Sequence, residues 1–336
     1  MADKLKFAFY WNASCGGCEV AVLDINEKIL EVAALADILL WPVALDFKYH
    51  HIEALPDQHI DVSFINGAIR NSEQKEISEL LRRKSKTVVA FGSCANLGGI
   101  PSLANLHNRE AIFHRAYIET PSTDNPNAVF PQVRTNVAEG ELELPLFLNH
   151  VYRLDQIIQV DYYLPGCPPT PKMIVEAVTA IASGNLPPAG TVFGGPSTVC
   201  DSCKRVKQEK KVRGFHRIHE IIPDSERCML EQGIICAGSA TRDGCGTRCL
   251  NANMPCRGCF GPADGVTDQG AKLLSILSTV VDSNDLDEIG EILDQIVDPA
   301  GYLYRFSMAS SLLKHKLAVE EKTEQATQRS KLEVGK

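Results

Sequence analysis

The chain has 336 residues, of which 44% are hydrophobic and 23% are charged, so a large packed domain and a smaller one can both form. Its formal charge of −8 argues against nucleic acid as a partner, because phosphate binding requires a basic surface. No apolar run reaches the roughly 18 residues of a membrane span. The N-terminus lacks a signal peptide's long apolar segment and a twin-arginine signal. We therefore expect a cytoplasmic protein without a membrane span.

The first half of the sequence alternates apolar runs with helical patterns. The runs at 6–11, 37–43, 61–66, 87–92 and 159–164 predict strands. Helices are predicted over 19–36, over 72–84 with Ser72 as the cap, and from Pro171 to about residue 184. Strands that alternate with helices predict an α/β fold with a doubly wound parallel sheet.

Twelve cysteines are unusual for a chain of this kind. Reducing conditions make structural disulfides unfavourable, so we expect these thiols to be catalytic or bound to metal. Twelve is also three times the four thiolates that a cubane iron–sulfur cluster takes, but only the positions of the cysteines can decide between these uses.

Four cysteines directly follow predicted strands. Cys15 and Cys18 come after the first strand, Cys94 follows the strand at 87–92, and Cys167 follows the strand at 159–164. Because the carboxyl ends of parallel strands share one edge of a sheet, these four thiols are predicted to meet there. The alternative, ordinary turns with buried thiols, is favoured for any single cysteine but not for all four. Nearby glycines would allow tight turns and backbone N–H contacts with cluster sulfurs: Gly16, Gly17, Gly92, Gly98, Gly99 and Gly166.

A long connection, residues 100–158, separates Cys94 from the last predicted strand. Residues 120–136 within it are rich in Pro, Ser, Thr and Asn and are predicted to form a surface loop. Connections of this length are often functional or docking elements.

The composition changes after residue 186. Residues 186–196 form a Pro- and Gly-rich linker, and helices are predicted over 269–281, 285–297 and 302–317, with a polar tail from 321. The region between can bury little apolar area, so metal ligation is expected to hold it together. Pairs such as Cys200/Cys203 suit zinc as well as iron–sulfur clusters, and two zinc sites are the main alternative. Eight cysteines lie there: Cys200, Cys203, Cys228, Cys236, Cys245, Cys249, Cys256 and Cys259.

The cysteine motifs resemble those of [NiFe]-hydrogenase small subunits. The run Cys15-Gly-Gly-Cys18-Glu19, the segment from Gly92 to Pro101 and the segment from Pro165 to Pro169 resemble the motifs of the proximal cluster. The run Gly244-Cys-Gly-Thr-Arg-Cys-Leu, followed by Pro255-Cys-Arg-Gly-Cys, resembles the cytosolic branch of that family. Order, spacing and Gly/Pro context match over residues 5–262.

This resemblance implies a flavodoxin-like domain over 1–185, an iron–sulfur domain over 186–320 and a polar tail over 321–336. It also implies three [4Fe–4S] clusters. Periplasmic relatives often have a histidine where Cys200 stands and a three-iron middle cluster, whereas Cys200 and Cys249 complete two four-cysteine sets here. The implied ligands are Cys15, Cys18, Cys94 and Cys167 for the proximal cluster, Cys245, Cys249, Cys256 and Cys259 for the medial one, and Cys200, Cys203, Cys228 and Cys236 for the distal one.

The resemblance further implies an electron-transfer subunit that assembles with a nickel–iron large subunit, where H2 is split. The methyl-viologen-reducing branch, which works with heterodisulfide reductase, is the most similar. Downstream partners would be iron–sulfur or flavin subunits. Alternatives are the small subunit of a deazaflavin-reducing hydrogenase or a sulfhydrogenase, a stand-alone electron carrier, a component of a respiratory quinone module and a zinc-stapled interaction protein.

Other residues carry weaker signals. His216 and His219 have ligand spacing, but they lie in or beside the basic stretch 204–217, which favours a solvated face or a surface for an acidic partner. Glu19 is interpreted as a helix-start carboxylate. The alternative is that it supports Cys18 or relays protons. No phosphate-binding glycine motif is present, so we expect neither nucleotide nor flavin in this chain.

Overall fold

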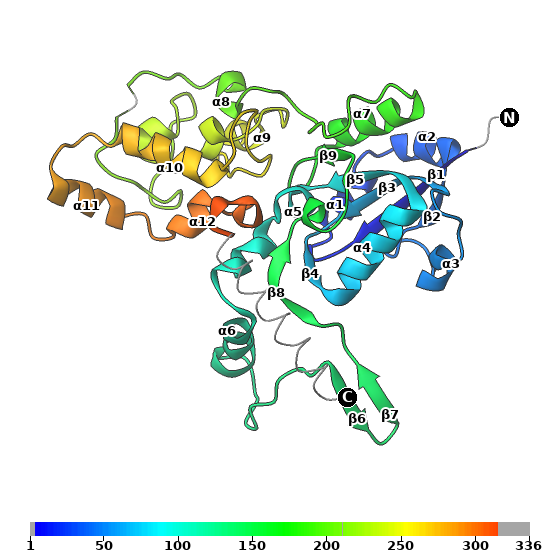
Figure 1. Ribbon diagram of the computed structural model, residues 1–336. Coiled ribbons are helices and arrows are strands. Elements are labelled where there is room, and N and C mark those ends of the chain that lie inside the picture. Colours follow the sequence, from blue (N-terminus) through cyan, green and yellow to red (C-terminus); the bar gives the residue numbers. More distant parts are fainter. Residues whose placement is uncertain (1–3, 210, 315–336) are drawn as a thin grey trace.

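The computed structural model describes residues 4–209 and 211–314. Its centre is a five-stranded sheet in the order β2-β1-β3-β5-β9, in which all neighbours are parallel (Figure 1). When only the five strands of this sheet are numbered, in chain order, their order across the sheet is 2-1-3-4-5. This is the flavodoxin-like order. The predicted doubly wound α/β fold is therefore confirmed. The strands are β1 Leu5–Trp11, β2 Ala36–Leu40, β3 Ile60–Asn66, β5 Ser85–Phe91 and β9 Tyr162–Leu164.

Alternating side chains of the strands enter two hydrophobic cores, one on each face of the sheet. On one face the rings of Phe9 and Phe64 stack with centroids 5.0 Å apart. Tyr10, the next residue of β1, belongs to the opposite core. Helices cover both faces, which leaves the ends of the strands for a site. The first core includes residues of α1 Gly17–Leu23, α2 Lys28–Leu35 and α7 Pro171–Ala182, and the second includes residues of α3 Tyr49–Glu53 and α4 Ser72–Lys84.

The cysteine-rich part, residues 186–314, has little regular structure. Its larger core is built around Leu273, Leu277 and Val280 of one helix, α10. A smaller core contains Cys236 and Cys256 among its buried residues, so sulfur atoms occupy space that apolar side chains would otherwise fill. The elements are α8 Val199–Ser202, η4 Leu230–Gln232, η5 Ala237–Ala240, α9 Arg248–Asn251, α10 Gln269–Val280, α11 Leu286–Asp294, α12 Pro299–Leu303, η6 Met308–Ser310 and η7 Leu312–Lys314.

The long connection after Cys94 forms an arm that projects away from the rest of the molecule (Figure 1). It returns through β8, which pairs antiparallel with the short strand β4. Near its tip, β6 and β7 pair only with each other. The elements are β4 Ile69–Asn71, α5 Ser93–Leu97, η1 Ile100–Leu106, α6 Arg109–His114, η2 Arg115–Glu119, β6 Arg134–Val137, β7 Gly140–Glu143, β8 Phe147–Tyr152 and η3 Leu154–Gln156.

Two predicted helix details in the first half are wrong. The helix expected over 19–36 is two helices, because α1 ends at Leu23 and α2 begins at Lys28. Asn26 between them has a φ of 56°, which lies in the left-handed region and cannot continue a right-handed helix. The cap of α4 is Asn71 instead of Ser72, since the Asn71 side chain accepts a hydrogen bond from the backbone N–H of Gln74 at 2.8 Å.

Further along the chain, the expected helices at 171–184, 269–281 and 285–297 are present as α7, α10 and α11. The helix expected over 302–317 is wrong for its described part, because α12 ends at Leu303 and only short 3-10 turns follow. Residues 315–317 of that prediction, and the tail from 321, lie outside the described residues. The loop expected over 120–136 ends earlier than predicted, because β6 begins at Arg134. No helix among the described residues is long and apolar enough to cross a membrane.

Candidate functional site

Four thiols, here called the inner group, meet where the strands end. Cys15 and Cys18 follow β1, Cys94 lies in the first turn of α5, and Cys167 follows β9. Burial raises the pKa of the Cys18 thiol, and the nearby charges of Cys94, Cys167 and Cys15 raise it further. The structure therefore brings together the four cysteines that were predicted to share this edge. Cys15 and Cys167 are exposed, whereas Cys18 is buried.

Two glycines leave room for these sulfur atoms. Gly92 has a φ of +84°, and a Cβ atom there would overlap the Cys18 sulfur. Gly99 has a φ of +60°, and a Cβ there would overlap the sulfur of Cys94. Backbone hydrogen bonds from Gly92 to the Leu164 carbonyl, 2.8 Å, and from Ser93 to the Gly166 carbonyl, 2.7 Å, join the loops. Side chains at these two positions would displace the thiols, so the backbone is shaped around sulfur.

Glu19 lies beside the inner group and is almost fully buried in the first turn of α1. Its carboxylate accepts hydrogen bonds from the Trp41 indole N–H and from the Asn66 side-chain amide. Burial raises the pKa of Glu19, although both hydrogen bonds act in the opposite direction. Glu19 is thus held by one residue after β2 and one at the end of β3. Its interpretation as a helix-start carboxylate did not include these two contacts. Asn66 was missed, although its place at a strand's carboxyl end was the available signal.

Four further thiols, here called the outer group, come from α8 and from the segment around η4 and η5. Cys200 and Cys203 lie at α8, and Cys228 and Cys236 flank η4. Burial raises the pKa of Cys200 to about 12, with contributions from the charges of Cys236, Cys228 and Cys203. Lys207 acts in the opposite direction and donates a hydrogen bond to the Cys200 carbonyl.

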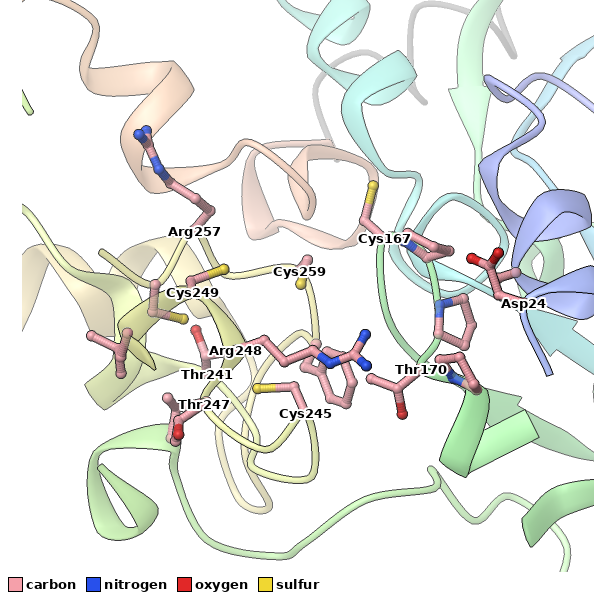
Figure 2. Close-up of a pocket in the computed structure, with 18 of the residues that line it drawn as sticks. Asp24, Cys167, Thr170, Thr241, Cys245, Thr247, Arg248, Cys249, Arg257 and Cys259 are labelled. Atoms are coloured by element: carbon pink, nitrogen blue, oxygen red, sulfur yellow. The ribbon is translucent and has the colours of Figure 1, made fainter. Parts of the chain in front are cut away.

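The last four thiols, the middle group, surround a cavity of about 460 Å³ between the sheet and the cysteine-rich part (Figure 2). Cys167 of the inner group lines the same cavity, and Arg248 extends across it toward Thr170 (Figure 2). Burial raises the pKa of Cys256 to about 12, and the charges of Cys259 and Cys245 contribute. The middle group comprises Cys245, Cys249, Cys256 and Cys259.

The middle group contacts both of the others. Burial raises the pKa of Cys259 to about 12, while a hydrogen bond from the backbone of Cys167 lowers it. On the other side, the backbone N–H of Cys256 donates to the Cys236 sulfur at 3.3 Å. The Ser93 hydroxyl also bonds to the Cys259 carbonyl and so joins α5 to the cysteine-rich part. The three groups therefore lie in series, with the middle group in contact with each neighbour.

The donor set fits iron–sulfur clusters. All twelve cysteines are free thiols. Crowded, buried thiolates repel one another, so they ionise together only when a cation compensates their charge, and metal binding releases their protons. No three His, Cys, Asp or Glu side chains in the described ranges lie close enough to hold a single metal ion. In a four-iron cluster each thiolate binds a different iron atom, so its ligands need not approach as closely as those of one ion.

The weaker candidates are structural or exposed. His216 and His219 are both exposed. In the basic stretch, Arg205 is buried and donates to the carbonyls of Asp224, Arg227 and Leu250. Lys211 and Arg213 both pair with Asp282. With Lys207, which donates to the Cys200 carbonyl, four cations of this stretch are therefore engaged within the chain.

Comparisons with known proteins find subunits of hydrogenases. The family model described as "NADH ubiquinone oxidoreductase, 20 Kd subunit" matches residues 15–181. The iron-sulfur subunit of the F420-non-reducing hydrogenase of Archaeoglobus profundus is 41% identical over 323 residues, covering 93% of this chain and 99% of the relative. The corresponding vhu polypeptide of the F420-non-reducing hydrogenase of Methanocaldococcus jannaschii is 38% identical, covering 90% and 94%.

Solved structures give weaker matches. A chain of an NAD+-reducing [NiFe]-hydrogenase in the H2-reduced state is 31% identical, with a TM-score of 0.47, over 54% of this chain and 93% of that one. A chain of the [NiFeSe]-hydrogenase of Dm. baculatum is 17% identical, with a TM-score of 0.48, over 79% and 96%.

Proposed function

Since the chain belongs to the family of iron–sulfur subunits of F420-non-reducing hydrogenases, which are small, electron-transfer subunits, we propose that it carries three [4Fe–4S] clusters. These would connect the nickel–iron site of a partner large subunit with a downstream iron–sulfur or flavin acceptor. The observation that carries this proposal is the arrangement of twelve free thiols as three groups of four in series.

The inner, middle and outer groups would hold the proximal, medial and distal clusters, respectively. Bound [4Fe–4S] clusters supply one-electron transfer. The protein's own residues hold the thiolates, exclude water from the buried ones and direct N–H groups at sulfur, which shifts the reduction potential. Residues 1–185 would form the domain of the proximal cluster and 186–320 that of the other two.

The downstream acceptor is proposed to be a heterodisulfide reductase complex, because the motifs resemble the branch that works with it. The identities favour this branch over the sulfhydrogenase type, since the delta polypeptide of the Pyrococcus furiosus sulfhydrogenase 2 is 22% identical over 77% of this chain. We further propose a cytoplasmic location. Anaerobic purification of the native complex tests the proposed acceptor. An acceptor other than heterodisulfide reductase in that complex would contradict it.

The cofactor proposal is tested by metal analysis together with one substitution. Wild-type protein should contain about twelve iron atoms per chain, and Cys94→Ala should lower this by about four, because the proximal cluster loses a ligand. The variant should also uncouple hydrogen oxidation from dye reduction. Gly290→Ala is the control, because the added methyl group would have no neighbour within 4 Å other than the backbone of its own helix. Zinc in place of iron, or full iron content with unchanged dye reduction in the variant, would contradict the proposal.

A further inference from the structure

The β6–β7 hairpin at the end of the arm has separate polar and apolar faces. Its register pairs Arg134 with Glu143, Thr135 with Leu142, Asn136 with Glu141 and Val137 with Gly140. Residues that lie directly opposite in an antiparallel pair share a face. Arg134, Asn136, Glu141 and Glu143 therefore lie on one face, and the opposite face carries Val133, Thr135, Val137, Leu142 and Leu144.

On the polar face, Arg134 and Glu143 form an ion pair at 3.4 Å within the hairpin. The apolar face is uncovered by the part of the chain that the structure describes. Val133 and Val137 are each 42% exposed, Leu142 is 54% exposed and Leu144 is 52% exposed. A lone two-stranded hairpin is marginally stable in water, and contiguous exposed apolar surface is typical of a binding site.

The arm begins at the rim of the inner group. The backbone of Ile100, at the start of η1, forms a hydrogen bond with the Cys94 thiol. Ile100 is 51% exposed, and Leu106 at the end of the same turn is 48% exposed. Cys15 and Trp11 are both exposed, and the Trp11 indole N–H donates a hydrogen bond to the carbonyl of Ser14, the residue before Cys15. Exposed apolar side chains thus lie at both ends of η1, and Asn105 of η1 is hydrogen-bonded to the backbone of Val151 in β8, the strand that follows the hairpin.

We propose that the apolar face of the β6–β7 hairpin docks on the nickel-containing large subunit, the same partner that covers the inner group. This rests on the proposed function, in which the proximal cluster exchanges electrons with that subunit and so requires its close approach. A partner that covers Cys15 and Ile100 would reach the hairpin along η1 and β8, which the hydrogen bonds between Asn105 and Val151 join. Residues 315–336 are mostly polar in sequence and do not match an apolar face of this kind.

The test uses the full, iron-loaded chain with Leu142→Ser and Leu144→Ser together. Its affinity for the large subunit should fall at least about tenfold, because two partly buried leucine contacts are lost. The matched control is Asn136→Ala with Glu141→Gln on the polar face of the same hairpin, which should change the affinity little. Iron content and visible absorbance should equal those of wild type in both double variants, which shows that the fold is retained.

Hydrogen–deuterium exchange of residues 133–144 provides a second measurement. Binding of the large subunit should slow exchange there in the wild type. If the apolar-face variant binds as tightly as wild type, or if exchange is unchanged in the complex, the docking proposal is overturned while the cluster assignment stands. If the variant loses only self-association, the face is instead a contact between copies of this chain. Wild-type protein that binds no large subunit would overturn the proposed function and, with it, the docking surface.

Discussion

Single residues determine whether the sulfur atoms can occupy the inner group. The strand-then-cysteine pattern predicts these four positions, because the carboxyl ends of parallel strands share an edge. The neighbours of Glu19 could not be predicted in the same way. Trp41 and Asn66 are 22 and 47 residues away in sequence, and their contacts depend on the side-by-side packing of β2, β1 and β3.

Gly92→Ala should abolish the proximal cluster, because the methyl group would overlap the Cys18 sulfur and the φ of +84° is strained for alanine. Iron content should fall by about four atoms per chain. Gly17→Ala is the matched control beside the same thiols, since its Cβ would lie 3.4 Å from the Cys15 sulfur, an ordinary contact. Equal iron loss in both variants, or in neither, would contradict this account.

At the scale of elements, the sequence predicts the parallel strands better than the ends of the helices. The strands are buried β-branched and aromatic runs, and their hydrophobicity identifies them directly. The break between α1 and α2 contains no proline or glycine that would indicate it in the sequence. Asn26, instead of a glycine, adopts the left-handed conformation there. The β6–β7 hairpin was also missed. Its strands are four residues each, too short for a clear alternating pattern.

Asn71→Ala should destabilise α4 and lower the stability of the protein by about 1 kcal/mol. The Asn71 side chain accepts from the Gln74 backbone, and the Gln74 side chain accepts a hydrogen bond from the Asn71 backbone N–H at 3.2 Å. Thermal midpoints of the loaded protein, measured at one scan rate, would show this loss. Glu76→Ala, on the exposed side of the same helix, should leave the midpoint nearly unchanged. A similar shift in both variants would mean that the cap is not the cause.

For the whole molecule, the resemblance implied three sets of four cysteines and their order as proximal, medial and distal, but the spacing of the cysteines alone gives neither the sets nor the contacts between them. Their order depends on contacts between distant segments, such as the Ser93 hydroxyl with the Cys259 carbonyl and the Cys256 N–H with the Cys236 sulfur. These contacts place the middle group between the other two.

Cys256→Ala should therefore interrupt electron transfer between the inner group and the outer group. Alanine keeps the backbone N–H that faces Cys236, so the outer group should retain its cluster while iron falls by about four atoms per chain. H2-driven reduction of the downstream acceptor should drop to background in the assembled complex. Hydrogen isotope exchange at the large subunit should persist, because it needs no net electron flow. Unchanged acceptor reduction with reduced iron content would contradict the serial arrangement.

The exposure of the thiols also bears on handling in air. Two of the four inner cysteines are exposed, whereas all four of the outer group are buried or partly buried. Cysteine oxidation follows accessibility, so oxygen damage to the unassembled chain should begin at the inner group, which the proposed function places against the large subunit. Binding of that subunit would then shield the inner group, and slow assembly would leave its exposed thiols open to oxygen for longer.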